Sequence, residues 1–132
     1  MWLPSSIEAV CGMAKIIVIE DEEELRQLIV DELEDAGHQA LEASDGVDGL
    51  STIMAENPDV IISDVGMPRM DGFQLKQKLQ ELPKHSPTPF LFLSALAFQQ
   101  AIERGMSIGA DEFMTKPVDF EDLLSRIETY ST

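Results

Sequence analysis

Asp59-Val60-Ile61-Ile62-Ser63-Asp64-Val65-Gly66-Met67-Pro68 is the stretch of sequence that decides the fold of this chain. Its apolar run is too short for a helix and is rich in β-branched residues, which predicts a strand buried on both faces. The strand ends at Asp64, and the glycine and proline that follow predict a turn. Open α/β sheets bind their ligands at the carboxyl ends of the strands. Because a buried strand gains nothing structurally from a charged tip, this position predicts a functional role for Asp64.

Four further runs of strand type continue this pattern along the chain. Residues 16–19 and 90–93 are entirely apolar, whereas 38–43 has little apolar content and is expected near an edge of the sheet. A fifth, short strand is expected at 113–115. Apolar residues at helical spacing follow each strand and predict a helix there. The helix expected at 44–57 has Val47, Leu50 and Met54 on one face. Five strands alternating with five helices predict a doubly wound parallel sheet, for which 2-1-3-4-5 is the common strand order.

The composition fits one globular domain and excludes several classes of function. The chain has 132 residues, and 44% of them are hydrophobic, which argues against disorder. Its net charge of −16 should repel phosphate backbones, so we expect no direct binding of nucleic acid. No apolar run is long enough for a membrane helix. A single cysteine, Cys11, allows no internal disulfide, which fits a cytoplasmic protein.

Residues 1–12 show no clear period and no secretory signal pattern, so we interpret them as an N-terminal extension that precedes a domain at 13–132. His38 and His85 lack the spacing of metal ligands, and we expect both at the surface.

Four of the five predicted strands end in polar side chains that could act together. Glu20-Asp21 follows the first strand, Asp64 ends the third, and Ser94 and Lys116 follow the fourth and fifth. Two carboxylates about 4 Å apart repel by roughly 4 kcal/mol at an effective dielectric near 20, so a cluster of acids needs a compensating cation. Mg²⁺ suits such a site, with Lys116 as a second source of positive charge. We therefore predict phosphoryl transfer to Asp64 as the nucleophile, with Ser94 donating to a phosphate oxygen.

Each of these residues also has a simpler interpretation when it is taken alone. Strand-end acids such as Glu20-Asp21 often cap helices, Ser94 fits a turn, and Lys116 fits a surface position. Phe113 is most simply a core residue. The joint placement at strand ends, and no single residue, favours the functional interpretation.

The chain resembles the receiver domain of two-component response regulators over Met13 to about Tyr130. The most specific match is Asp64-Val65-Gly66-Met67-Pro68-Arg69-Met70-Asp71-Gly72. The others are Val18-Ile19-Glu20-Asp21-Glu22, Ser94-Ala95, Gly109-Ala110-Asp111-Glu112-Phe113 and Lys116-Pro117. Serine at 94 in place of the commoner threonine keeps the hydroxyl group, and phenylalanine at 113 lacks the hydroxyl group of tyrosine.

The resemblance implies a flavodoxin-like (βα)₅ fold and phosphorylation of Asp64 by a histidine of a sensor kinase or phosphotransfer protein. It implies Mg²⁺, with Mn²⁺ as an alternative ion, held by Asp21, Asp64 and the carbonyl of Gly66, with Glu20 acting mainly through water. Lys116 would pair with the phosphate, before a cis bond to Pro117. The phosphate-binding and switch positions would be Ser94, Ala95, Phe113 and Lys116, which reshape the face of the fourth helix, fifth strand and fifth helix.

The resemblance implies a phosphoacceptor and not an enzyme, although such a domain can assist its own phosphorylation and dephosphorylation. Dimerisation through that face is common in the family. A haloacid-dehalogenase-type phosphatase would place a second acid where this chain has Gly66. A flavodoxin-type flavin module would need a glycine-rich phosphate loop where the acids 20–24 stand. An inert pseudo-receiver that only binds partners is the third alternative.

Overall fold

A computed structural model describes residues 13–95 and 99–130 of the chain. Within these residues, five parallel strands form one sheet in the order β2-β1-β3-β4-β5. This confirms the expected doubly wound fold and its strand order, and it puts β2 and β5 at the two edges. The strands are β1 (Lys15–Ile19), β2 (Gln39–Ala43), β3 (Val60–Asp64), β4 (Phe90–Ser94) and β5 (Glu112–Thr115).

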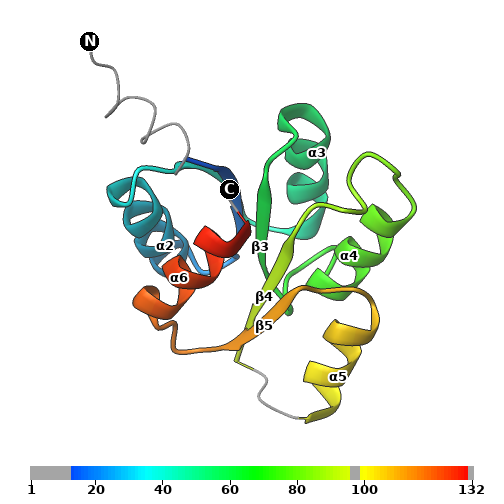
Figure 1. Ribbon diagram of the computed structural model, residues 1–132. Helices are drawn as coiled ribbons and strands as arrows, with labels where there is room; N and C mark the ends of the chain where they lie inside the picture. The colour runs from blue at the N-terminus through cyan, green and yellow to red at the C-terminus, as the bar shows by residue number, and fades with distance from the viewer. Residues whose placement is uncertain (1–12, 96–98, 131–132) are drawn as a thin grey trace.

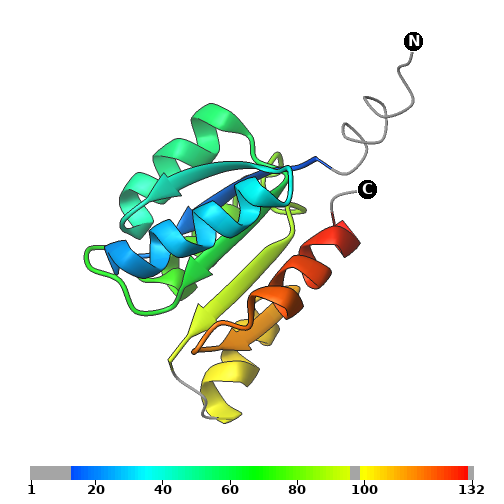
Figure 2. The same ribbon diagram turned by 90° about the vertical axis from the view of Figure 1, so that its left-hand side faces the viewer.

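Five helices in the described residues cover the two faces of the sheet. Figures 1 and 2 show α2 and α6 on one face and α3, α4 and α5 on the other. The strand arrows in Figure 2 point to the same edge, which is therefore the edge where functional side chains are expected. The helices are α2 (Glu23–Asp35), α3 (Gly46–Glu56), α4 (Gly72–Gln80), α5 (Gln99–Ser107) and α6 (Phe120–Tyr130).

Sequence signals explain where the helices begin and end. Asp45 caps α3 by accepting the backbone N–H of Asp48 at 2.9 Å, and Asp71 forms a reciprocal capping box with Gln74 at the start of α4. Gly37, with φ of 96°, follows α2 in the left-handed conformation that glycine tolerates. The helix expected at 97–108 begins at Gln99 in the structure, and 97–98 lie outside the described residues, as does the proposed extension 1–12.

Two apolar clusters separate the sheet from its helices. One lies under α2 and α6 and contains Ile29, Leu33, Leu123 and Ile127, while the other lies under α3, α4 and α5. The inner strands β1, β3 and β4 have almost no exposed apolar atoms, as expected for strands of a parallel sheet covered on both sides. This burial holds the strand ends, and so the polar residues at them, in fixed positions.

The structure corrects the predicted packed face of α3. Of the three residues expected on that face, Leu50 packs partly against the core, but Val47 and Met54 are exposed, because Gly46, Gly49 and Ile53 form the most buried face of the helix.

The two histidines, His38 and His85, are buried and not at the surface, with exposures of 6% and 7%. Lys76 was not singled out by the sequence, yet it is buried on α4 with its ammonium group 5.4 Å from the centre of the Phe90 ring. No helix among the described residues has the length and apolarity needed to cross a membrane.

Candidate functional site

Three carboxylates from two neighbouring strands meet at the carboxyl edge of the sheet. Glu20 and Asp21 follow β1 directly, and Asp64 is the last residue of β3. These strands pair in register, with Ile19 opposite Ser63, so their ends lie level. One oxygen of each carboxylate lies within 4.8 Å of the others. The structure thus brings together the acids that the sequence pattern selected.

Glu20 is the most deeply buried member of this acidic cluster, with 1% of its surface exposed. Its Oε2 accepts the backbone N–H of Glu22 at 3.0 Å. Its Oε1 lies 2.8 Å from Lys116 Nζ, an ion pair, but accepts no well-directed hydrogen bond from any described residue. Burial raises the pKa of the Glu20 carboxyl to about 7, despite the opposing effects of Lys116 and the Glu22 N–H. A buried oxygen without a well-placed donor leaves a ligand position for a cation.

Asp64 is buried as well, and both of its oxygens have partners. Oδ1 accepts the N–H of Val65 at 2.7 Å, and Oδ2 accepts Lys116 Nζ at 3.2 Å. The N–H of Gly72 then donates to the carbonyl of Val65 at 2.8 Å, which closes the base of the loop at 65–71. A Cβ at position 72 would collide with the carbonyl of Asp64, so glycine allows α4 to start against the end of β3.

Lys116 lies between the two buried acids and is itself half-buried. Burial alone would lower the pKa of its amine, but the carboxylates of Glu20 and Asp64 outweigh that effect and raise it. Its backbone N–H donates to the carbonyl of Ser94 at 2.8 Å, and the Lys116–Pro117 peptide bond is cis. Lys116 is therefore fixed at the main chain as well as through its side chain.

The remaining predicted positions line the adjoining strands. Ser94 is buried at the end of β4, one residue beyond the partner of Asp64, and Ala95 is exposed just after it. Phe113 on β5 is half-buried, with its ring centre 5.8 Å from that of Phe92. Gly66 lies two residues after Asp64 in loop 65–71 and is exposed.

The residue types at this site suit a hard divalent cation. All three acids offer oxygen ligands, and one ammonium group, that of Lys116, pairs with two of the three carboxylates, which leaves an excess of negative charge. Mg²⁺ is commonly held by one or two carboxylates together with waters and phosphate oxygens. Asp21 is exposed, so water and solutes can reach the site from its side.

Arg26 is a site residue that the sequence analysis missed. Its Nη1 donates to the carbonyl of Glu20 at 2.8 Å, and its Nε donates to Glu42 at 3.1 Å. It thereby ties the end of β1 to α2 and to β2. Arg26 lies 6 residues from Glu20 and 16 residues from Glu42 in the sequence, and neither spacing belongs to a pattern that predicts a contact.

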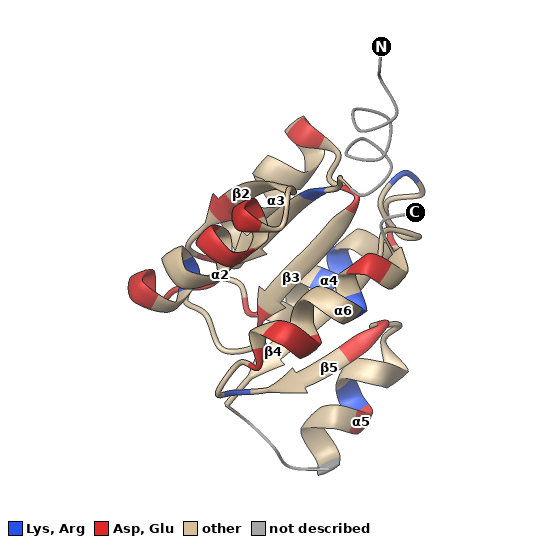
Figure 3. Ribbon diagram, turned by 60° about the vertical axis from the view of Figure 1, so that its left-hand side comes forward, with Lys and Arg blue, Asp and Glu red and all other residues tan. Residues whose placement is uncertain are grey.

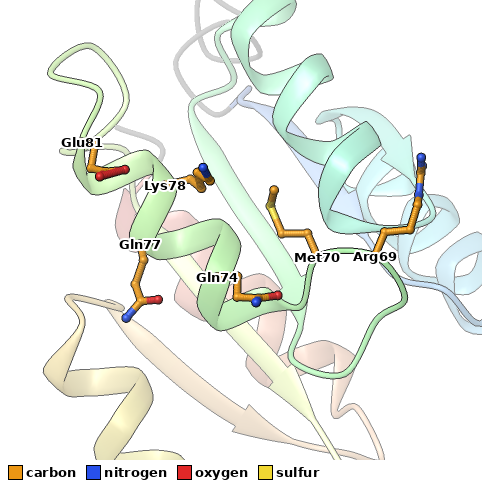
Figure 4. A pocket seen from close by; sticks show the side chains of 6 residues that line it. All are labelled: Arg69, Met70, Gln74, Gln77, Lys78 and Glu81. Carbon is orange, nitrogen blue, oxygen red and sulfur yellow. The ribbon is translucent and has the colours of Figure 1, made fainter.

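Two surface hollows flank the edge of the sheet. One of about 520 Å³ is formed by α2 and residues 116–120 and includes Leu25, Leu28 and Lys116. The other, of about 480 Å³, lies along α4, and Figure 4 shows the side chains that surround it. None of the three clustered acids lines this second hollow, so we do not connect it with the chemistry. Its lining residues are Arg69, Met70, Gln74, Gln77, Lys78 and Glu81.

The acidic residues extend well beyond the site. Figure 3 shows them over α2, β2 and α6, with fewer basic residues scattered between the elements. Two members of the cluster at the sheet edge, Glu20 and Asp64, differ from these other acids because they are buried and pair with Lys116.

Comparison with known proteins identifies the family of the chain. The family model of the response regulator receiver domain matches residues 16–128. RpaA of Synechocystis sp., described as a DNA-binding dual master transcriptional regulator, is 35% identical over 115 residues, which are 87% of this chain and 48% of RpaA. The sensor histidine kinase RcsC of Escherichia coli is 33% identical over 131 residues, which are 98% of this chain and 14% of RcsC. The chain thus spans about half the length of RpaA and a small part of RcsC.

Solved structures agree as well. The chemotaxis protein CheY4 of Vibrio cholerae superposes with a TM-score of 0.84 at 32% identity, covering 89% of this chain and 98% of CheY4. The fold and the acidic site define a phosphoacceptor-type α/β domain, and the chain belongs to the response regulator receiver domain family of two-component systems.

Proposed function

We propose that Asp64 accepts a phosphoryl group from a phosphohistidine of a sensor kinase or a histidine phosphotransfer protein. A carboxylate oxygen of Asp64 attacks phosphorus, the P–N bond breaks, and the imidazole leaves with the electron pair of that bond. The product is an acyl phosphate on Asp64. The observation that carries this proposal is the position of a buried carboxylate, 3.2 Å from Lys116 Nζ, inside an acidic cluster.

The same residues would hold Mg²⁺, or Mn²⁺ in its place. Asp21, Asp64 and the carbonyl of Gly66 would be direct ligands, and Glu20 would act mainly through water. When bound, the ion neutralises the charge that develops on the phosphoryl oxygens. Lys116 supplies the second positive charge from the position directly after β5, and its contacts with Glu20 and Asp64 hold it there before the donor arrives.

Phosphorylation would be transmitted through Ser94 and Phe113. The Ser94 hydroxyl would turn to the new phosphate and the ring of Phe113 would move inward, which would change the face formed by α5, β5 and α6. A downstream partner, or a second copy of the chain, would read this face. The domain would act in the cytoplasm as a phosphoacceptor that assists its own phosphorylation and dephosphorylation, with no separate substrate and no direct contact with nucleic acid.

The test is the intact mass of the protein after incubation with acetyl phosphate, with and without Mg²⁺. We expect a mass gain of roughly 80 Da, the mass of one phosphoryl group, that requires Mg²⁺. Asp64→Asn keeps the size and the fold but removes the nucleophile, so it should show no gain.

A gain of equal size in wild type and Asp64→Asn would mean labelling elsewhere and would refute the assignment. If the wild type shows no gain, binding of beryllofluoride separates a short-lived acyl phosphate from an inert pseudo-receiver, because only a competent site binds that phosphoryl mimic.

A further inference from the structure

We infer that Arg69 is a positioning residue that holds loop 65–71 against α3 and so keeps this loop in the shape that divalent-cation binding requires. The inference rests on the proposed function, because Gly66, a proposed ligand, lies in this loop. Arg69 Nε donates to Asp45 Oδ2 at 2.8 Å, and Nη2 lies 2.7 Å from the same oxygen and 3.2 Å from Asp48 Oδ1. In Figure 4 the Arg69 side chain points away from Gln74 and Gln77 of α4.

The backbone at Arg69 needs such support. Its φ is 67°, in the left-handed region that residues with a Cβ adopt only at an energetic cost. The N–H of Met70 donates to the carbonyl of Pro68 at 2.8 Å, so residues 68–70 form a three-residue turn centred on Arg69. A γ-turn with positive φ at its centre is rare and strained. A strained turn persists only when the surrounding contacts hold it.

The partner of Arg69 is fixed in turn. Asp45 is buried, and while its Oδ2 receives Arg69, its Oδ1 caps α3 by accepting the N–H of Asp48. The loop also packs directly on the first turn of this helix, since a Cβ added at Gly46 would lie 2.8 Å from Met70 Cβ. The loop is therefore tied at its base, by the Gly72 to Val65 hydrogen bond, and at its tip, by Arg69 and Gly46.

The ion contacts of Arg69 are all with α3, and none is with Glu20, Asp21 or Asp64. Its effect on the site therefore acts through the loop. Without the contact to Asp45, the strained turn relaxes and the segment that begins at Val65 samples other shapes. The backbone at Gly66, two residues after Asp64, then no longer presents its carbonyl in a single orientation. The residues that orient metal ligands typically matter almost as much as the ligands themselves.

The test compares wild type with Arg69→Ala in two measurements. Free Mn²⁺ is followed by electron paramagnetic resonance during a titration, and amide hydrogen exchange of residues 65–67 is followed by NMR in the metal-free protein. We expect Mn²⁺ to bind roughly tenfold more weakly, a typical effect of losing a ligand-orienting residue. We also expect faster exchange at 65–67, with exchange in β1, β3 and β4 unchanged.

The direction of the metal effect separates this role from simple electrostatics. Removal of a positive charge near an acidic cluster would by itself tighten Mn²⁺ binding. Arg126→Ala is the matched control, because Arg126 also pairs with two acids, Asp122 and Glu112, but on the far side of the sheet. It should leave both measurements unchanged.

A double-mutant comparison tests the pairing itself. Asp45→Asn keeps an oxygen that can cap α3 but loses the charge that Arg69 contacts, so it should weaken Mn²⁺ binding in the wild type and have little further effect in Arg69→Ala. Equal or tighter Mn²⁺ binding by Arg69→Ala, with unchanged exchange at 65–67, would overturn the inference. Because the exchange measurement needs neither metal nor phosphate, it can succeed even if Asp64 proves not to be phosphorylated.

Discussion

At the scale of single residues, the site depends on one positively charged side chain, Lys116, which compensates the charges of two buried acids. Lys116 Nζ contacts both Glu20 and Asp64, and no other lysine or arginine among the described residues pairs with either acid. Breaking a fully buried ion pair typically costs about 3–5 kcal/mol, because a charge is left without a partner. Lys116 is partly exposed, so its loss should cost less than that range.

We expect Lys116→Ala to lower the free energy of unfolding by about 2 kcal/mol in EDTA, measured by urea denaturation. Mg²⁺ should then stabilise this variant more than it stabilises the wild type, since the ion replaces the missing positive charge and binds only the folded state. Lys15→Ala is the control, because Lys15 forms an exposed pair with Glu56 at 3.5 Å. Equal gains from Mg²⁺ in wild type and Lys116→Ala would contradict the compensation argument.

At the scale of elements, α5 and β5 approach each other at a glycine. A Cβ added at Gly105 would lie 2.9 Å from Cδ2 of Phe113 and 3.2 Å from Cδ2 of Phe92. Glycine in a helix normally costs about 1 kcal/mol relative to alanine, so its presence at a buried position indicates a packing requirement. The space it leaves is occupied by the ring of the proposed switch residue.

Gly105→Ala should therefore destabilise the protein by about 1 kcal/mol, despite the gain in helix propensity, because the ring of Phe113 must move. In a Phe113→Ala background the same substitution should become neutral or stabilising. Chemical denaturation of the four proteins gives the coupling free energy directly. If Gly105→Ala stabilises the wild type as much as it stabilises the Phe113→Ala variant, the ring does not depend on this glycine.

A second element-scale contact joins the residue before β1 to the residue before β2. His38 Nδ1 accepts the backbone N–H of Ala14 at 3.1 Å, which requires an unprotonated nitrogen. Burial lowers the pKa of the His38 side chain, against a smaller raising effect of Glu128. The unfolded chain therefore takes up a proton at a higher pH than the folded chain does.

The sign of the pH effect follows from this difference. The contribution of His38 to stability is fully present above the unfolded pKa, about 6.5, and is lost as pH falls below it towards the folded value. We expect the free energy of unfolding to fall between pH 7.5 and about 5.5 more steeply in the wild type than in His38→Gln. Parallel pH profiles of the two proteins, from urea titrations, would show that His38 is not the linked group.

At the scale of the whole molecule, the sequence predicted the architecture well because hydrophobic runs and turn residues report on burial along the chain. The alternation of strands and helices predicted a doubly wound parallel sheet, and the order common to such sheets, which the sequence does not show directly, brought Glu20, Asp21 and Asp64 together. The packed face of α3 could not be predicted from hydrophobic residues, because two of the residues that form it, Gly46 and Gly49, have no side chain. The Arg69–Asp45 contact also escaped prediction, since it joins residues 24 positions apart through the shape of one turn.

The net charge of −16 is a property of the whole molecule with its own consequence. Like charges held in a compact fold repel, and salt weakens this repulsion as the screening length falls from about 30 Å at 0.01 M to about 10 Å at 0.1 M. In EDTA, we expect NaCl over that range to stabilise the protein by about 1 kcal/mol and to raise its melting temperature by about 3–5 °C.

The matched variant is the double substitution Glu34→Lys and Asp35→Lys, which changes the net charge from −16 to −12, because each replacement adds two units. Both residues are exposed at the end of α2, where positive charge also favours the helix dipole, and both lie far along the helix from Glu20. The variant should melt at a higher temperature at low salt and respond less to NaCl than the wild type does. Equal salt responses would mean that the stabilisation comes from ion binding at the acidic cluster, and not from screening of the whole surface.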